Sequence, residues 1–295
     1  MVGISVFPKC YMEDICVGRM SVFDWVKIAA QLKPDGLELY SGFLKNHNSR
    51  YLSKLRTAIG DHGFEIPMMC YSSDFTFRDK KKRQQEVAKQ REIIEVTAEL
   101  GGGFCRVLSG QRRQGLSREK GVEVVVESIK DCLATAEEFR VILVMENHYK
   151  DNFWKYPEFA QKKDLFLEII SQIDSPFFGV QFDPSNSILA GEDPIQLLEE
   201  VKHRVRTVHA SDRYVERGVK LEELKLFNGT VGYPEKLRHG VIGKGLNNYH
   251  RIFSLLKEAD FQGWVSIEDG INGIEELKES LKFLREMRER YFGDG

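Results

Sequence analysis

Residues 141–148 read VILVMENH, which is five apolar residues followed by a carboxylate, an amide and an imidazole. An unbroken apolar run with β-branched members is typical of a strand that is buried on both faces, as in a parallel sheet. In α/β proteins, ligands bind beyond the carboxyl ends of such strands. This stretch therefore predicts an α/β fold with Glu146 and His148 at the edge of a binding site.

Short apolar runs alternate along the whole chain with longer amphipathic, charged segments, which is the pattern of repeated βα units. Strands are predicted at residues 3–10, 36–40, 65–71, 104–109, 141–148, 178–184, 205–211 and 263–269. Helices are predicted at residues 21–32, 49–62, 79–100, 117–139, 164–173, 194–203, 247–259 and 274–291. This order predicts a (β/α)8 barrel, or TIM barrel, that forms a single domain over residues 1–295. A doubly wound open sheet is the alternative, but no glycine-rich phosphate-binding motif follows the first strand.

Two segments do not fit the alternating pattern. Residues 149–163 and 213–244 contain aromatic side chains and have little periodicity. They follow the fifth and seventh predicted strands. Loops of this length in a compact domain are typical of lids or binding elements, so we expect both to border the site.

The composition favours a small-molecule ligand. The chain has 43 basic and 45 acidic residues, and the formal net charge of -2 gives no field that would attract DNA or an anionic membrane. Nowhere do eighteen apolar residues run together, so no membrane span is predicted. The N-terminus lacks the pattern of an export signal. The five cysteines show no C-x-x-C or zinc-type spacing, which predicts free thiols in a reducing cytoplasm.

Strands five to eight each carry one strong metal-ligand type near the carboxyl end. Because side chains alternate along a strand, Glu146, Asp183, His209 and Glu268 would converge at the mouth of a barrel. Taken alone, an acidic residue such as Asp183 before Pro184 is more often a turn or cap residue. Together, three carboxylates and one imidazole predict a site for one divalent ion, which would be Mn²⁺, Mg²⁺, Co²⁺ or Zn²⁺.

Five motifs carry a resemblance to a known family. They are MENH at 145–148, FDPSN at 182–186, VHASD at 208–212, GKG at 243–245 and GWVSIED at 263–269. This set resembles the sugar-phosphate isomerase/epimerase group of xylose isomerase-like TIM barrels, whose members include ketose 3-epimerases and inosose isomerases and dehydratases. The resemblance covers most of the chain and is densest from Leu143 onward. It implies that Glu146, Asp183, His209 and Glu268 bind one divalent metal, and that the two glutamates also move protons.

The resemblance also implies a substrate class, which is a keto or hydroxy sugar. A metal that holds both oxygens of an α-hydroxy ketone stabilises the enediolate that forms when the neighbouring C–H proton is removed. One glutamate would take this proton as general base, and the other would return one from the opposite face. The predicted function is therefore a metal-dependent isomerase or epimerase that acts on a ketose, sugar phosphate or inosose. An inosose dehydratase-type lyase and a non-catalytic sugar-binding barrel are the alternatives.

The sequence departs from the ketose 3-epimerase pattern at two positions. Asn186 stands where those enzymes have a histidine, three residues after the metal-binding aspartate. Their substrate-binding arginine would fall at Val215, with Arg213 close by. We expect Asn186 and Arg213 to contact the substrate, together with His148. Trp154 could stack on the apolar face of a sugar, although packing within its own loop is an equal alternative.

The endonuclease IV branch shares the barrel but cuts DNA with three metals. It requires a histidine at the position of Asn186 and a D-x-H element after strand seven, and neither is present. A role in DNA repair is therefore disfavoured. Arg106 lies inside the fourth predicted strand, where a buried ion pair is expected. The sequence does not determine the oligomeric state, and a homo-oligomer is compatible with it.

Overall fold

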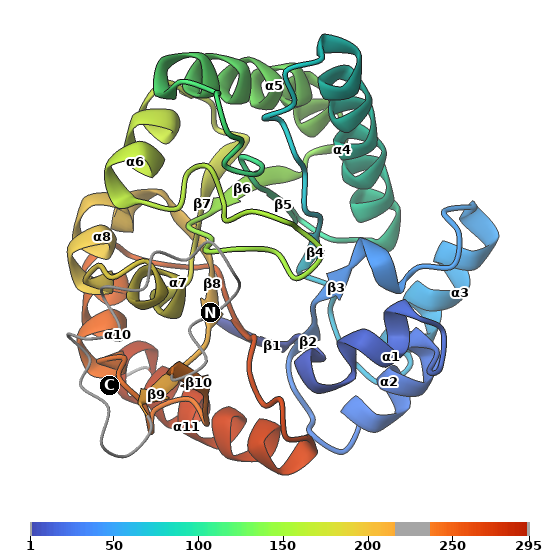
Figure 1. Ribbon diagram of the computed structural model, residues 1–295. Helices are drawn as coiled ribbons and strands as arrows, with labels where there is room; N and C mark the ends of the chain where they lie inside the picture. The colour runs from blue at the N-terminus through green and yellow to red at the C-terminus, as the bar shows by residue number, and fades with distance from the viewer. Residues whose placement is uncertain (1, 216–236, 294–295) are drawn as a thin grey trace.

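The fold is taken from a computed structural model, which describes residues 2–215 and 237–293. Nine of its strands form one parallel sheet in the order β2-β1-β11-β8-β7-β6-β5-β4-β3, and Figure 1 shows the helices in a ring around it. The bounds are β1 Gly3–Val6, β2 Gly36–Leu37, β3 Leu39–Tyr40, β4 Met68–Cys70, β5 Phe104–Val107, β6 Ile142–Glu146, β7 Phe178–Phe182, β8 Val205–Ala210 and β11 Trp264–Ile267.

The barrel closes through the second predicted strand. Its two parts, β2 and β3, lie on either side of Glu38, and β2 pairs with β1 while β3 pairs with β4. Residues 36–40 therefore join the two ends of the sheet order into a ring. The prediction of a (β/α)8 barrel is confirmed. All eight predicted strands are present, although each is shorter than predicted.

The helices of the ring also follow the prediction. They are α2 Val22–Ala29, α3 Ser49–Gly60, α4 Lys80–Leu100, α5 Arg118–Phe139, α6 Lys163–Ser171, α8 Pro194–Val201, α10 Tyr249–Glu258 and α11 Ile274–Phe292. Ser21, Asn48, Asp79 and Ser117 begin the first four, because each side chain accepts a hydrogen bond from a backbone N–H group of the first turn. Gly101, at a φ of 89°, ends α4 in the left-handed conformation that glycine adopts without strain.

Two short α-helices in the described part of the chain were not predicted, α1 (Met12–Cys16) and α7 (Pro184–Leu189). The strand predicted at residues 178–184 was too long at its end. The Asp183 side chain accepts hydrogen bonds from the N–H groups of Ser185 and Asn186, and Pro184 occupies the first turn of α7. Asp183 is thus the N-cap of a helix, and proline at the first helical position favours the helix over a longer strand.

The inner strands are buried on both faces, as the run at 141–148 predicted. Leu143 and Met145 of β6 are fully buried in the main core between strands and helices. Val144 points the other way and packs with Met68 and Cys70 inside the barrel. Because side chains alternate along the strand, Glu146 lies on the same inward face as Val144. The strand therefore delivers its carboxylate to the interior.

Both predicted long loops lie at the carboxyl ends of strands. Residues 147–162 connect β6 to α6, and Glu158 anchors them by accepting the backbone N–H of Ser109 at 2.7 Å. The second loop begins and ends as an antiparallel pair, β9 (Arg213–Val215) with β10 (Leu237–His239). Residues 216–236 of that predicted loop lie outside the described residues. Within the described ranges, no helix is long and apolar enough to cross a membrane.

The G-K-G motif has a structural role beside this second loop. The Asp212 carboxylate accepts hydrogen bonds from the backbone N–H groups of Gly243, Gly245 and Asn247. A Cβ on Gly245 would lie 2.4 Å from the backbone oxygen of Arg213, which only glycine avoids. The motif therefore wraps a buried carboxylate at the end of β8.

Candidate active site

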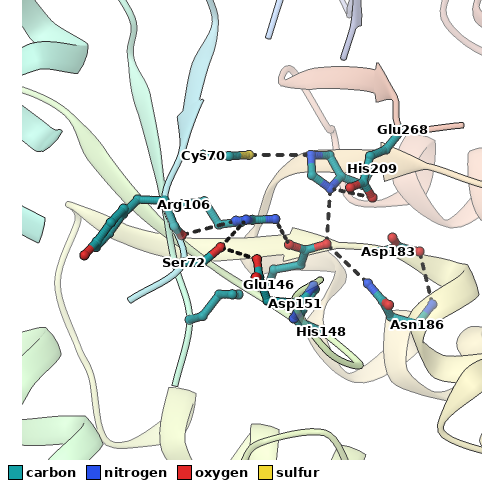
Figure 2. Close-up of polar contacts among 12 residues, drawn as sticks. Cys70, Ser72, Arg106, Glu146, His148, Asp151, Asp183, Asn186, His209 and Glu268 are labelled. Atoms are coloured by element: carbon teal, nitrogen blue, oxygen red, sulfur yellow. Dashed lines mark hydrogen bonds and ion pairs between the residues drawn. The ribbon is translucent and has the colours of Figure 1, made fainter. Parts of the chain in front are cut away.

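Four predicted site residues meet at the mouth of the barrel. Glu146, Asp183, His209 and Glu268 come from or directly after β6, β7, β8 and β11, which are neighbours in the sheet. One ligand atom from each lies within 4.8 Å of the others. Figure 2 shows these side chains gathered around His209. The parallel register produces this convergence, since Ser266 pairs with His209 and Glu146 pairs with Gln181.

The imidazole of His209 lies at the centre of the cluster and is fully buried. Its Nδ1 is 3.1 Å from Oε1 of Glu146 and 3.3 Å from Oε2 of Glu268. Its Nε2 lies on the other side of the ring, 2.6 Å from Oε1 of Glu38. Burial alone would lower the pKa of His209, but the charges of Glu38, Glu268 and Glu146 raise it well above its ordinary value. Without a metal ion, these charges favour the protonated ring.

Glu146 is held from three directions. Arg106 donates to its Oε2 at 2.8 Å, and Asn186 donates to its Oε1 at 3.3 Å on the side where His209 also lies. Figure 2 shows these contacts, with Arg106 also bonded to Ser72. Burial opposes ionisation of Glu146, yet the positive charges of His209 and Arg106 lower its pKa. The predicted buried ion pair of Arg106 is confirmed.

Glu268 is held by a different cation, Lys9, whose Nζ lies 2.9 Å from Oε1. Burial acts to raise the pKa of Glu268, but Lys9 and His209 together bring it well below its ordinary value. Both glutamates therefore carry a negative charge, and each has its own positive partner. One partner is a guanidinium that stays charged at any relevant pH, whereas the other is an amine.

Asp183 completes the cluster. Its Oδ1 accepts from the hydroxyl of Ser211 at 2.7 Å and from the N–H groups that begin α7. Burial, followed by the negative charges of Glu268 and Glu146, raises its pKa to about 7. Asp183 is therefore both the cap residue and the cluster member that the sequence offered as alternatives. It caps a helix through one oxygen and presents its carboxylate to the cluster.

The donor set fits a divalent metal ion. Three carboxylates and an imidazole nitrogen lie close enough to share one ion, and these are ligands that Mn²⁺, Mg²⁺, Co²⁺ and Zn²⁺ accept. Burial is the main cause of the raised pKa of Asp183, and the negative charges of Glu268 and Glu146 raise it further. A divalent cation bound here would offset those charges and favour the ionised carboxylate.

A polar cavity opens beside the cluster and is bordered by the loop after β6. His148 lines it, and the His148 Nδ1 lies 3.3 Å from Oε2 of the buried Glu158. Trp154 places its ring edge-on to His148, with centroids 6.3 Å apart. The complete lining is Phe7, Lys9, Met12, Tyr40, Arg106, His148, Lys150, Asp151, Asn152 and Glu268.

Asn186 and Arg213, which were predicted to contact the substrate, both make contacts within the protein. The amide of Asn186 donates to Glu146, and its oxygen accepts the N–H of Tyr149, so this side chain supports a site residue directly. Arg213 is buried at the start of β9. It pairs with His239 of β10 in the antiparallel register. Substrate contact by either residue stays a prediction.

Three charged residues that contact the cluster, Glu38, Lys9 and Arg106, were not assigned to it from the sequence. Glu38 lies between β2 and β3, not at the end of a strand. Lys9 follows β1 and Arg106 lies within β5, so neither belongs to strands five to eight, which carry the predicted ligands. One feature of the sequence does point to a buried partner for Glu38. A carboxylate in the middle of the buried run GLELY, at 36–40, is costly unless it is paired. That cost points to a specific partner but does not identify it.

Comparison with known proteins agrees with this architecture. Residues 26–287 match the family model of the xylose isomerase-like TIM barrels. The chain belongs to this family. The resemblance carried by the strand-end motifs is thereby confirmed.

The relatives include inosose dehydratases. The inosose dehydratase of Clostridium beijerinckii is 21% identical over 237 residues, which is 76% of this chain and 75% of that protein. Among solved structures, the IOLI protein with a zinc atom aligns with a TM-score of 0.76, 16% identity and coverage of 99% and 100%. A D-tagatose 3-epimerase-like protein aligns with a TM-score of 0.74, 19% identity and coverage of 99% and 98%. The chain is accordingly an enzyme of the broad isomerase, epimerase and lyase group.

Proposed function

We propose that this barrel catalyses proton transfer next to the carbonyl of a ketose, sugar phosphate or inosose, with the help of one divalent ion. The observation that carries the proposal is the pair of buried, ionised glutamates. Glu146 and Glu268 both lie within 3.3 Å of Nδ1 of His209, and each is paired with a separate cation. Two carboxylates that reach one point from different strands supply the two groups that a proton removal and a proton return require.

The metal would be held by Glu146, Asp183, His209 and Glu268. A divalent ion bound there supplies Lewis-acid polarisation of the substrate oxygens, which makes the adjacent C–H group more acidic. The zinc atom in the IOLI protein supports a divalent ion at a barrel of this kind. The oxygen-rich donor set is equally compatible with Mn²⁺, Mg²⁺ and Co²⁺.

The protein side chains would carry the proton. Arg106 and Lys9 keep the two glutamates ionised, so either can accept a proton from the substrate carbon. In an epimerisation or isomerisation, the second glutamate returns a proton to carbon on the other face or to the neighbouring carbon. His148, which is held by Glu158 and lines the cavity, would donate a hydrogen bond to a sugar hydroxyl. Arg213, Asn186 and Trp154 are the other proposed substrate contacts.

Elimination of water from an inosose is the second candidate. It is favoured by the curated relatives named inosose dehydratase, which match about three-quarters of this chain. Asn186 in place of a histidine also departs from the ketose 3-epimerase pattern. In this reaction one glutamate removes the C–H proton and the leaving hydroxyl receives one from an acid in the cavity. We also propose that the enzyme works in the cytoplasm, where five free thiols would stay reduced.

Turnover across a panel of ketoses and inososes in heavy water tests the proposal. The metal-loaded protein should convert at least one member and place solvent deuterium on the carbon next to the carbonyl. Nuclear magnetic resonance of the product separates an epimer, an isomer and a dehydrated ring. Failure to convert any member, with the metal site shown to be full, would leave a non-catalytic sugar-binding barrel as the better description.

A further inference from the structure

Glu38 is a buried carboxylate that the proposed reaction does not use. It interrupts the second barrel strand between β2 and β3 and is 1% exposed. Its Oε1 lies 2.6 Å from Nε2 of His209 and accepts the thiol hydrogen of Cys70 at 3.0 Å. A carboxylate at this depth costs several kcal/mol unless it is paired, so these contacts account for its presence inside the barrel.

The two ring nitrogens of His209 face different groups. Nδ1 faces Glu146 and Glu268, which are proposed metal ligands, and Nε2 faces Glu38. A histidine that binds a metal through one nitrogen keeps its hydrogen on the other, and a carboxylate at that second nitrogen fixes both the tautomer and the ring orientation. Since Nδ1 is directed at the other ligands, the hydrogen belongs on Nε2.

We propose that Glu38 is a positioning residue for the metal centre. By accepting the Nε2 hydrogen of His209, it holds the ring with the Nδ1 lone pair directed at the point where Glu146, Asp183 and Glu268 meet. This inference rests on the metal centre of the proposed function but not on the identity of the substrate.

A second metal ion between Glu38, Cys70 and His209 is the competing interpretation, because their ligand atoms also lie within 4.8 Å of one another. The distance between Oε1 of Glu38 and Nε2 of His209 argues against it. Their 2.6 Å separation is that of a direct hydrogen bond, and two ligands of one ion would lie farther apart.

Substitutions of Glu38 test the proposal through metal affinity. Glu38→Ala should weaken Mn²⁺ and Zn²⁺ binding roughly 10- to 100-fold, as loss of a carboxylate behind a metal-bound histidine does. Glu38→Gln should lose less, because its amide oxygen can still accept the Nε2 hydrogen. Cys70→Ala is the matched control, since Cys70 is as deeply buried and touches the same oxygen. It should bind metal as the unmodified protein does.

Two readouts separate positioning from mere packing. Competition with a chelator measures metal affinity, and nitrogen-15 resonance of the ring reports which nitrogen of His209 carries hydrogen. The metal-loaded protein should show the Nε2–H tautomer. An Nδ1–H tautomer, or unchanged affinity in a folded Glu38→Ala variant, would overturn the proposal. The tautomer is read in the unmodified protein, so the test survives a variant that fails to fold. Neither readout needs turnover, so a failed reaction assay does not bear on it.

A separate feature lies just outside the polar cavity. An open pocket of about 550 Å³ is bordered by four large apolar side chains and five other residues, which are Met12, Val17, Phe153 and Ile271 and then Lys9, Cys10, Glu13, Asn152 and His239. Phe153, Val17 and Ile271 are 64%, 57% and 44% exposed, which is unusual for large apolar side chains that gather from three different loops. The loops follow β1, β6 and β11, and so they belong to the same end of the barrel as the metal cluster.

The pocket and the cavity share part of their lining. Lys9, Met12 and Asn152 border both spaces, and Lys9 also contacts Glu268. A ligand that extends from the cavity into the pocket would therefore meet polar groups first and apolar groups next. We infer that the outer pocket binds an apolar substituent of the substrate, such as the aryl group of an aryl glycoside whose sugar ring carries the carbonyl. This inference rests on the proposed function for the sugar end of the ligand.

Binding of two glycosides to the metal-loaded protein tests this inference. Phenyl β-D-glucopyranoside should bind roughly tenfold more tightly than methyl β-D-glucopyranoside, because the ring would leave water for an apolar surface. The Phe153→Ser, Ile271→Ser double variant should abolish the difference. Phe139→Ser, at the end of α5 and 38% exposed, is the control and should preserve it. Equal binding of the two glycosides, or no binding of either, would overturn the inference. The heavy-water assay reports the reaction separately.

Discussion

Replacing Arg106 by methionine should destabilise the metal-free protein by about 3–5 kcal/mol, the usual cost of removing one partner of a buried ion pair. The side chains of Arg106 and Glu146 are 6% and 0% exposed, and their 2.8 Å contact is almost wholly shielded from water. Methionine fills much of the same volume, so the change removes a charge more than it removes packing. At roughly 2 °C per kcal/mol for a chain of this size, Tm should fall by about 6–10 °C.

Calorimetry in the presence of a chelator measures this shift. Arg118→Met is the matched control, because Arg118 pairs with Asp164 and Glu168 at a side-chain exposure of 45% and its loss should cost at most about 1 kcal/mol. Saturating Mn²⁺ should reduce the difference in Tm between the Arg106→Met variant and the unmodified protein, since an ion beside Glu146 supplies the missing positive charge. A Tm within 1–2 °C of the unmodified protein without metal, roughly the effect of a surface pair, would refute the reasoning.

Asp183→Ala and His209→Ala should each lower metal content sharply while circular dichroism stays that of a folded barrel, and full occupancy by elemental analysis would remove both from the ligand set. Glu146→Gln and Glu268→Gln keep an oxygen for the metal but lose the basic oxygen, so turnover should fall by roughly 10²- to 10⁴-fold, far more than metal affinity. Asn186→Ala should weaken substrate binding by about 1–3 kcal/mol with metal content unchanged, and loss of metal would instead place Asn186 among the ligands.

The barrel could be predicted from the alternation of apolar runs and amphipathic segments. Hydrophobic residues recur with the period of a strand in some segments and with the period of a helix in others, and neither period depends on contacts between distant residues. The errors lie at ends and in loops. The strand predicted to Pro184 stops earlier because Asp183 caps a helix, and α1 is too short for its period to be visible. The β9–β10 pair was missed because its strands are three residues each.

The positions of the four cluster residues also followed from local pattern. The two-residue period of a strand determines which side chains face inward, and parallel strands end on one side of a barrel. Glu146, Asp183, His209 and Glu268 could therefore be placed together from the sequence. Their partners could not. His209 and Glu38 are 171 residues apart, Lys9 and Glu268 are 259 apart, and Arg106 and Glu146 are 40 apart.

By itself, the sequence determined the strands, the helices and the face on which each strand-end side chain lies, because these depend on periodicities that act within a few residues. Only the tertiary structure decided which cation neutralises which glutamate and which nitrogen of His209 faces Glu38. Those pairings form across the barrel interior, where closure of the sheet sets the distance and angle between side chains. Burial then makes each pairing decisive, since a charge removed from water must be met by the one group that geometry places beside it.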